Sequence, residues 1–291
     1  MFSGAITALV TPFRDGRVDD EALRRHVEGQ ITAGIDGLVP CGTTGESPTL
    51  TPEEQRHVVH TVVEQVRGRV PVIAGAGSNS TAHAAELARA AREQGADGLL
   101  VVTPYYNKPT QEGLVRHFTA VIQAGRLPTV LYNVPGRTGC DLLPDTLSRL
   151  CELSDVVAVK EATGSVVRAQ QILARLGGRL VVLSGDDCTC FPLMSVGARG
   201  VISVTSNVAP AKMAAQWDAV AAGEWDRARA LHLELLPLHD AMFLESNPMP
   251  VKAALAIMGA VDPEIRLPLT PLSPAAEEKL RGVLRAQGLL K

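Results

Sequence analysis

The stretch PVIAGAGSNSTAHAAELARAAREQGADGLLVVTP, residues 71–104, holds the pattern that decides the fold of this chain. It opens with the apolar run 71–77 and closes with the apolar run 98–104. Between them, residues 80–96 carry apolar side chains at helical spacing behind Ser80, a residue type that favours helix starts. A strand, a helix and a strand in this order predict two parallel strands joined by a crossover helix.

The same alternation continues along most of the chain. Helix-patterned segments such as 19–34 and 51–66 separate eight short apolar runs, which are 5–13, 37–42, 71–77, 98–104, 128–134, 156–162, 180–186 and 200–206. Nearly continuous apolar runs are typical of parallel strands buried on both faces. Eight such units predict an α/β fold, a (β/α)8 TIM barrel. An open doubly wound sheet is the alternative, but the first run lacks the glycine-rich turn of dinucleotide-binding proteins.

The strand pattern ends after about residue 207, and the remainder is predicted to be helical. Segments 207–243, 247–260 and 273–290 have helical spacing and are divided by proline and glycine. We therefore expect a (β/α)8 barrel over residues 1–225 and a C-terminal helical region over residues 226–291.

Composition and charge exclude several classes of protein. Of the 291 residues, 46% are hydrophobic, which suffices for one large core. The net charge of −3 indicates neither nucleic acid nor an anionic membrane as a partner. No apolar stretch approaches the roughly 20 residues of a membrane-spanning helix, and the apolar start lacks the basic region of a signal peptide. Five cysteines without a C-x-x-C pair predict buried free thiols, so we expect a cytoplasmic protein.

One lysine stands inside an apolar run, where lysine is rare. The segment VVAVKEATG, residues 156–164, is predicted to be a buried strand in which Val156, Ala158, Lys160 and Ala162 share one face. In a barrel this face points into the lumen, and Lys160 lies near the end of the strand where active sites occur. Burial lowers the pKa of a lysine, and a neutral amine can form a Schiff base with a ketone. The alternative is a structural lysine paired with a carboxylate.

Tyrosines and a glycine-rich turn lie where other predicted strands end. The three tyrosines are Tyr105, Tyr106 and Tyr132, in TPYYNKP and LYNVPG. A phenol at such a place can relay protons, or it can simply close the end of the barrel. The turn CGTTGES, residues 41–47, offers successive amides and two hydroxyls to a carboxylate or phosphate, although it is not a P-loop.

Charged residues end two further runs. Arg137, in GRTG, could bind a substrate carboxylate through two hydrogen bonds or could pair with a surface carboxylate. Asp186 and Asp187 could suggest a metal site, but no histidine joins them, so we favour a turn or helix-cap role. The seven histidines are scattered without ligand spacing, and we predict no metal site.

Motifs in this order and spacing resemble those of a known family. The segments GTTGES (42–47), YYNKPTQEG (105–113), YNVPGRTG (132–139) and VVAVKEATG (156–164) are similar to dihydrodipicolinate synthases, and the likeness extends to SNPMPVKAAL (246–255). VKEATG and GTTGES mark a wider superfamily of pyruvate-dependent class I aldolases, whereas YYNKPTQEG with GRTGCDL is specific to the synthases. The resemblance implies a lyase that joins pyruvate to aspartate 4-semialdehyde and cyclises the product, in lysine and diaminopimelate biosynthesis. It implies neither a metal nor an organic cofactor.

The resemblance also implies a set of catalytic residues. Lys160 would form the Schiff base with pyruvate, and Tyr132 would relay protons and help to place the pyruvate carboxylate. Thr43 would link Tyr132 to Tyr106 in a hydrogen-bonded triad. Tyr106 would come from the neighbouring subunit, so that activity needs a tight dimer; two such dimers would form a homotetramer.

The same resemblance implies the substrate-binding residues. Thr44 would bind the pyruvate carboxylate with its amide and hydroxyl, and Arg137 would bind the carboxylate of aspartate semialdehyde. Gly185 and Ile202 would line the site through their backbone.

One departure from the family pattern concerns regulation. Lysine-inhibited members carry a lysine pocket built from histidines, a glutamate, an asparagine and a tyrosine. The matching positions in this chain are Pro52, Gln55, Asn79, His83 and Tyr105. Because the histidines and the glutamate are replaced, we expect weak or absent inhibition by lysine.

Two other functions remain open at this point. A sister aldolase acting on N-acetylneuraminate or a 2-keto-3-deoxy sugar acid would keep Lys160, Tyr132 and GTTGE but would generally differ at GRTG. A barrel with a binding or regulatory role would need no reactive lysine. The presence of Lys160, Tyr132 and Thr43 together favours an enzyme.

Overall fold

The eight long strands of the chain form one sheet, as predicted for a (β/α)8 barrel. The computed structural model describes residues 2–290, so the outermost residues of the two predicted domains, 1 and 291, lie outside the described residues. The order of the strands in the sheet is β4-β1-β10-β9-β8-β7-β6-β5. Every long strand overlaps one of the eight predicted runs, and the fold class is confirmed; the bounds are β1 Gly4–Ala8, β4 Gly37–Val39, β5 Ile73–Gly75, β6 Gly98–Val102, β7 Thr129–Asn133, β8 Val156–Glu161, β9 Val181–Ser184 and β10 Gly200–Ser203.

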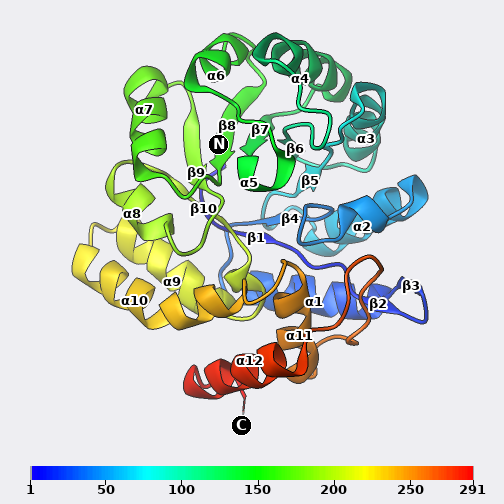
Figure 1. Cartoon of the computed structure of the whole chain (residues 1–291), viewed down its shortest axis with the longest axis vertical. Coiled ribbons are helices and arrows are strands. Elements are labelled where there is room, and N and C mark those ends of the chain that lie inside the picture. Colours follow the sequence, from blue (N-terminus) through cyan, green and yellow to red (C-terminus); the bar gives the residue numbers. More distant parts are fainter. Residues whose placement is uncertain (1, 291) are drawn as a thin grey trace. The chain divides into compact units, whose positions relative to one another are not determined.

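The chain divides into two compact units, which we call the central unit (residues 2–3 and 71–202) and the terminal unit (residues 4–70 and 203–290). In the central unit, parallel strands β5 to β10 alternate with helices, and Figure 1 shows α3, α4, α6 and α7 on the outer side of β5 to β9. The helices of this unit are α3 Thr81–Glu93, α4 Gln111–Gly125, α5 Pro135–Thr138, α6 Pro144–Leu150, α7 Val166–Leu176 and α8 Cys190–Ser195.

Local sequence explains where these helices begin. Ser80, Thr110 and Ser165 precede α3, α4 and α7, and each side-chain oxygen accepts the backbone N–H of the residue three positions on. Such caps satisfy donors that a helix leaves unpaired at its first turn. Buried alanines and a leucine form the inner face of α3, at the helical spacing that the sequence predicts, namely Ala84, Leu87, Ala88 and Ala91.

The register between β7 and β8 decides which side chains meet. Tyr132 pairs with Lys160, and the next pair is Asn133 with Glu161. Because side chains alternate along a strand, these two pairs point to opposite faces of the sheet. An irregularity in the register leaves Val157 without a pairing partner on β7, so the predicted alternation does not extend unbroken from Val156 to Lys160.

The terminal unit combines two parallel strands with the predicted C-terminal helices. Strands β1 and β4 are parallel neighbours. A short antiparallel hairpin, β2 Phe13–Arg14 with β3 Arg17–Val18, was not predicted from the sequence. The helices are α1 Asp20–Thr32, η1 Ser47–Thr49, α2 Pro52–Val66, η2 Thr205–Asn207, α9 Pro210–Ala221, α10 Trp225–Ala241, α11 Met249–Ile257 and α12 Pro274–Ala286.

Cysteines and helix lengths agree with the composition. All five cysteines are free; Cys41 and Cys190 are buried, whereas the other three are partly exposed, contrary to the expectation that all are buried. Within residues 2–290, no helix combines the length and the apolar character needed to cross a membrane.

Candidate active site

Lys160 is the buried amine around which the candidate site is built. It is the penultimate residue of β8, and 5% of its surface is exposed. Burial lowers its pKa from 10.5 to about 8, although the carboxylate of Asp187 acts to raise it; the Arg137 guanidinium lowers it further. At neutral pH a much larger fraction of this amine is therefore uncharged than in an ordinary lysine.

The ring of Tyr132 lies directly against this amine. Lys160 Nζ is 4.2 Å from the centroid of the ring, because the register pairs the two residues on β8 and β7. Tyr132 is itself buried, so its phenol group and the Lys160 amine are both shielded from water. A cation above an aromatic ring is stabilised, which opposes the effect of burial on the lysine. Desolvation by burial is the largest cause of the lowered pKa of Lys160.

The two predicted lining residues lie at the ends of β9, which neighbours β8, and β10, the next strand of the sheet. A Cβ atom on Gly185 would lie 3.0 Å from Cε of Lys160 and 2.6 Å from Cβ of Ala162, so a side chain at residue 185 would displace the lysine. Ile202 is buried in β10, one residue after Val201, which pairs with Ser184. The fold thus places Gly185 and Ile202 at the ends of β9 and β10.

The two aspartates after β9 have separate structural roles. Asp186 accepts the backbone N–H of Cys188 at 2.8 Å, which is the predicted turn role. Asp187 is buried, and its charge acts on Lys160. Within residues 2–290, no group of three or more His, Cys, Asp or Glu side chains is arranged to hold a metal ion.

Arg137 and Tyr106 lie on neighbouring exposed turns of the central unit. Arg137 is exposed on the short helix α5, and its charge acts on Lys160. Tyr106 is 89% exposed, has a left-handed backbone with φ of 74°, and donates its N–H to the Thr138 carbonyl at 3.2 Å. Its side chain is thus exposed on a turn that is hydrogen-bonded to the helix carrying Arg137.

The glycine-rich turn 41–47 is a compact structure within the terminal unit. Thr44 is buried, and its hydroxyl accepts a hydrogen bond from the side-chain amide of Asn247 at 3.1 Å, while Thr43 is half-buried. A Cβ atom on Gly45 would lie 3.1 Å from the Cys41 nitrogen and 3.1 Å from the Leu9 carbonyl oxygen, so the close packing of the turn favours glycine there.

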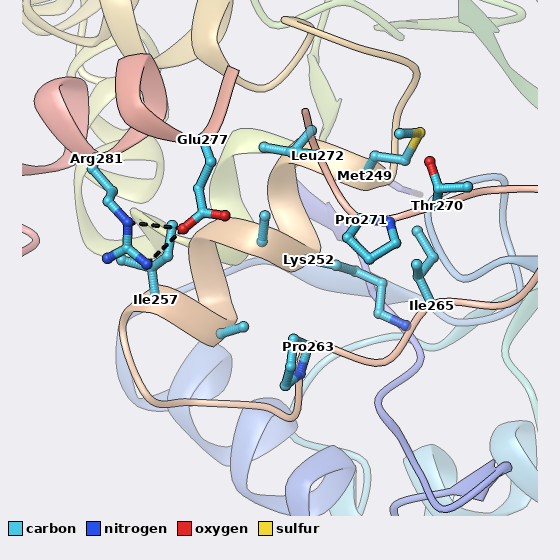
Figure 2. A pocket seen from close by; sticks show the side chains of 12 residues that line it. Met249, Lys252, Ile257, Pro263, Ile265, Thr270, Pro271, Leu272, Glu277 and Arg281 are labelled. Atoms are coloured by element: carbon cyan, nitrogen blue, oxygen red, sulfur yellow. Dashed lines mark hydrogen bonds and ion pairs between the residues drawn. The ribbon is translucent and has the colours of Figure 1, made fainter. Parts of the chain in front are cut away.

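A buried ion pair anchors the same turn to helix α11. Lys252 Nζ lies 2.5 Å from a carboxylate oxygen of Glu46, and both side chains are 1% exposed. The ring of Phe13 lies 4.3 Å from Lys252 Nζ, and the other oxygen of Glu46 accepts the backbone N–H of Arg266 at 3.0 Å. Figure 2 shows Lys252 beside a cavity of about 240 Å³ that none of the predicted catalytic or binding residues lines.

The residues predicted for a lysine pocket fall in both units. In the central unit, His83 lies 3.8 Å from the carboxylate of Glu86, and the Asn79 carbonyl accepts a hydrogen bond from the Asn107 side chain at 2.9 Å. Tyr105 is half-buried two residues before Asn107. In the terminal unit, Pro52 is the exposed first residue of α2, and Gln55 is buried and donates to the Ser47 carbonyl at 3.1 Å.

Sequence reasoning missed several buried or partly buried polar residues near these motifs. Asn247 and Lys252 lie in SNPMPVKAAL, where a lysine inside an apolar segment is the same signal that identified Lys160. Asn133, Asp141 and Arg168 form a network behind the strand ends, and no local pattern indicates it.

Comparisons with known proteins agree with this geometry. The model of the dihydrodipicolinate synthetase family matches residues 1–287. The 4-hydroxy-tetrahydrodipicolinate synthase of Geobacter metallireducens is 56% identical over 290 residues, covering 100% of both chains. Among solved structures, dihydrodipicolinate synthase from Aquifex aeolicus is 47% identical with a TM-score of 0.97 and 99% of each chain covered. The chloride-inhibited dihydrodipicolinate synthase from Acinetobacter baumannii, complexed with pyruvate, is 47% identical with a TM-score of 0.98 and 100% of each chain covered. This chain therefore belongs to the dihydrodipicolinate synthetase family.

Proposed function

We propose that this chain condenses pyruvate with L-aspartate 4-semialdehyde and cyclises the product, the reaction of a 4-hydroxy-tetrahydrodipicolinate synthase. Such an enzyme is a lyase with Schiff-base chemistry. The observation that carries the proposal is the buried Lys160, whose pKa is lowered to about 8 against the ring of Tyr132. Family membership over the whole chain supports the same reaction and disfavours a sister aldolase for sugar acids.

The environment of Lys160 suits the first chemical step. At pH 8 about half of the amine is neutral, whereas fewer than about 1 in 100 ordinary lysines would be. The neutral nitrogen attacks the keto carbon of pyruvate, and loss of water gives an iminium ion. The buried charge of Asp187 favours a cation at this nitrogen, so it stabilises the iminium that replaces the amine.

The following steps need proton transfers close to the same nitrogen. Loss of a methyl proton from the iminium gives an enamine, which attacks the aldehyde carbon of the second substrate. The amine of that substrate then displaces Lys160 and closes a six-membered ring. We assign the proton relay to Tyr132, whose ring lies 4.2 Å from Lys160 Nζ, with Thr43 and Tyr106 as its hydrogen-bonded partners.

Substrate carboxylates require donors at the mouth of the barrel. We assign the pyruvate carboxylate to the amide and hydroxyl of Thr44, and the semialdehyde carboxylate to the guanidinium of Arg137. Gly185 and Ile202 would line the pyruvate site through their backbone. The steric limit at Gly185 supports this assignment, because it keeps space open beside the lysine side chain.

A second copy of the chain completes the proposed site. Tyr106 is 89% exposed, which supports its contribution to the active site of a neighbouring subunit. We infer a homotetramer of two tight dimers that acts in the cytoplasm. Within each subunit, residues 1–225 would form the catalytic barrel and residues 226–291 the C-terminal helical region.

Feedback inhibition by lysine should be weak or absent. A lysine ligand carries an ammonium group, which a carboxylate holds well. The matching positions instead carry Pro52, Gln55 and His83, none of which supplies a carboxylate, while Asn79 and Tyr105 are retained. His83 already lies beside Glu86 on its own helix.

The decisive experiment is a coupled assay with the purified protein. Pyruvate and aspartate semialdehyde are mixed with the enzyme and the next reductase, and NADPH oxidation is followed. Turnover that disappears in Lys160→Met, together with borohydride trapping of pyruvate on wild type alone, would support the proposal. Trapping without turnover would instead indicate a pyruvate-dependent aldolase with another aldehyde partner.

A further inference from the structure

A buried polar network lies on the face of β7 and β8 that is opposite to Tyr132 and Lys160. Asn133 and Glu161 are the last residues of these strands, pair in register and are both buried. The side-chain amide of Asn133 donates to a carboxylate oxygen of Glu161 at 3.2 Å. The other carboxylate oxygen of Glu161 accepts the backbone N–H of Thr163 at 2.8 Å. Hydrogen bonds on this opposite face thus hold in place the residues that follow Tyr132 and Lys160.

Asn133 also closes the loop that carries Arg137. Its amide donates to the Asp141 carboxylate at 2.9 Å, and its carbonyl oxygen accepts the backbone N–H of Leu142 at 2.9 Å. Residues 134–141, which include helix α5, therefore form a loop that begins directly after Asn133 and ends at a hydrogen bond to the Asn133 side chain. A loop whose two ends are clamped in this way has fewer conformations available to the side chain at its centre.

Arg168 on α7 completes the clamp. Its two terminal nitrogens each lie 2.8 Å from one oxygen of Asp141, a bidentate arrangement. This hydrogen bonding is the main cause that lowers the pKa of Asp141 and raises that of Arg168, so the pair stays charged near neutral pH. Both side chains are partly shielded from water, and two parallel hydrogen bonds fix the orientation of the pair as well as its separation.

We propose that Asn133, Asp141 and Arg168 are positioning residues that hold Arg137 in the orientation needed to bind the carboxylate of the second substrate. This inference deepens the proposed function and rests on the role assigned there to Arg137. The clamp touches the loop of Arg137 and lies on the opposite face from the Lys160 amine. It should therefore set the affinity for aspartate semialdehyde while leaving Schiff-base formation with pyruvate unchanged.

The test compares Arg168→Met with a matched control on the same helix. Arg175 also lies on α7 and pairs with an aspartate, Asp145, but both are exposed. We expect Arg168→Met to raise the KM for aspartate semialdehyde by about tenfold or more, because small misplacements of a substrate clamp have large effects. The KM for pyruvate and the extent of borohydride trapping should stay within about twofold of wild type. Arg175→Met should leave all three unchanged.

A double-mutant cycle shows whether the clamp acts through Arg137. If it does, adding Arg168→Met to Arg137→Ala causes no further rise in the semialdehyde KM. Additive effects, or an equal rise in the KM for pyruvate, would overturn the inference while leaving the proposed function intact. If Arg137→Ala alone leaves the semialdehyde KM unchanged, the assigned role of Arg137 fails, and the clamp hypothesis fails with it. Asp141→Asn, which keeps the shape but removes the charge, should reproduce the Arg168→Met result in a folded protein.

Discussion

Replacing the buried Lys160 with methionine should make the protein more stable while abolishing its activity. Methionine resembles lysine in length but carries no charge. The lowered pKa, from 10.5 to about 8, means that the protonated form costs about 3 kcal/mol in the folded protein, at about 1.4 kcal/mol per pKa unit. The face of the Tyr132 ring recovers about 0.5–2 kcal/mol of this cost by holding a cation. A net gain of about 1–3 kcal/mol is therefore expected at pH 7.

The sign of the pH dependence follows from the same numbers. Below pH 8 the lysine is protonated in both the folded and the unfolded chain, so the penalty is fully present in wild type. Between pH 8 and about 10.5 the unfolded chain binds more protons than the folded one, and the stability of wild type rises with pH. The advantage of Lys160→Met should therefore shrink over this interval. A gain that does not change with pH would contradict desolvation as its cause.

Lys252 supplies the matched control, because replacing it with methionine should make the protein less stable rather than more stable. Lys252 is also buried, but its ammonium group lies 2.5 Å from the carboxylate of Glu46. Lys252→Met would leave a buried carboxylate without its partner, at a cost of about 3–5 kcal/mol. Replacing both residues, as Glu46→Gln with Lys252→Met, should recover most of this loss, since glutamine can still accept the backbone N–H of Arg266.

Urea unfolding of the four proteins between pH 7 and pH 10 tests these expectations. Protomer concentrations must be equal, because subunit association contributes to apparent stability. The reasoning is refuted if Lys160→Met is less stable than wild type at pH 7. It is equally refuted if Lys252→Met costs less than about 1 kcal/mol, since a pair exposed to water would behave in that way.

Three further results are expected. The rate of trapping pyruvate on Lys160 should rise between pH 6 and about pH 8 and then level off, and a rise that continues to pH 10 would mean that the amine has an ordinary pKa. Tyr132→Phe keeps the ring beside the amine but removes the hydroxyl group, so kcat should fall by about 10²–10⁴-fold with little change in the urea midpoint of unfolding. A kcat within about threefold of wild type would exclude Tyr132 as the proton relay. Lysine at millimolar concentration should leave turnover unchanged in the coupled assay. Half-inhibition below about 1 mM would contradict the assignment of a degenerate pocket.

The fold was predictable because burial on both faces leaves a strong local signal. Each long strand lies within or beside an apolar run, yet the strands are shorter than the runs, since the final residues of a run turn into the loops at the mouth. The run 37–42, for example, contributes a strand only over Gly37–Val39. The hairpin Phe13–Val18 was missed because its strands have two residues each and show no alternation. The register irregularity at Val157 likewise has no sequence signal, as it depends on the neighbouring strand.

Site residues were predictable from the sequence where the residue type is unusual in its local segment. They were not predictable where the role of the residue depends on a partner distant in sequence. Lys160 is conspicuous in VVAVKEATG, and strand periodicity places it toward the barrel mouth. Asn133 and Arg168 are ordinary residues at a strand end and in a helix, and their clamp on Asp141 requires three segments to meet. Local sequence does not predict these contacts with Asp141, because they form only when α7 packs against the loop after β7.

Lys252 shows why the lysine signal alone does not identify a nucleophile. It stands in PMPVKAALAI, a segment as apolar as that of Lys160, and both lysines have a pKa lowered chiefly by burial. The difference lies in what compensates the charge. Lys252 meets the carboxylate of Glu46, 206 positions away in sequence, and this contact favours the charged, unreactive form. Lys160 meets the face of an aromatic ring, and although the charge of Asp187 raises its pKa, burial still lowers that pKa to about 8. A buried lysine in an apolar run therefore predicts a compensating partner, and the chemical nature of that partner decides whether the lysine is structural or reactive.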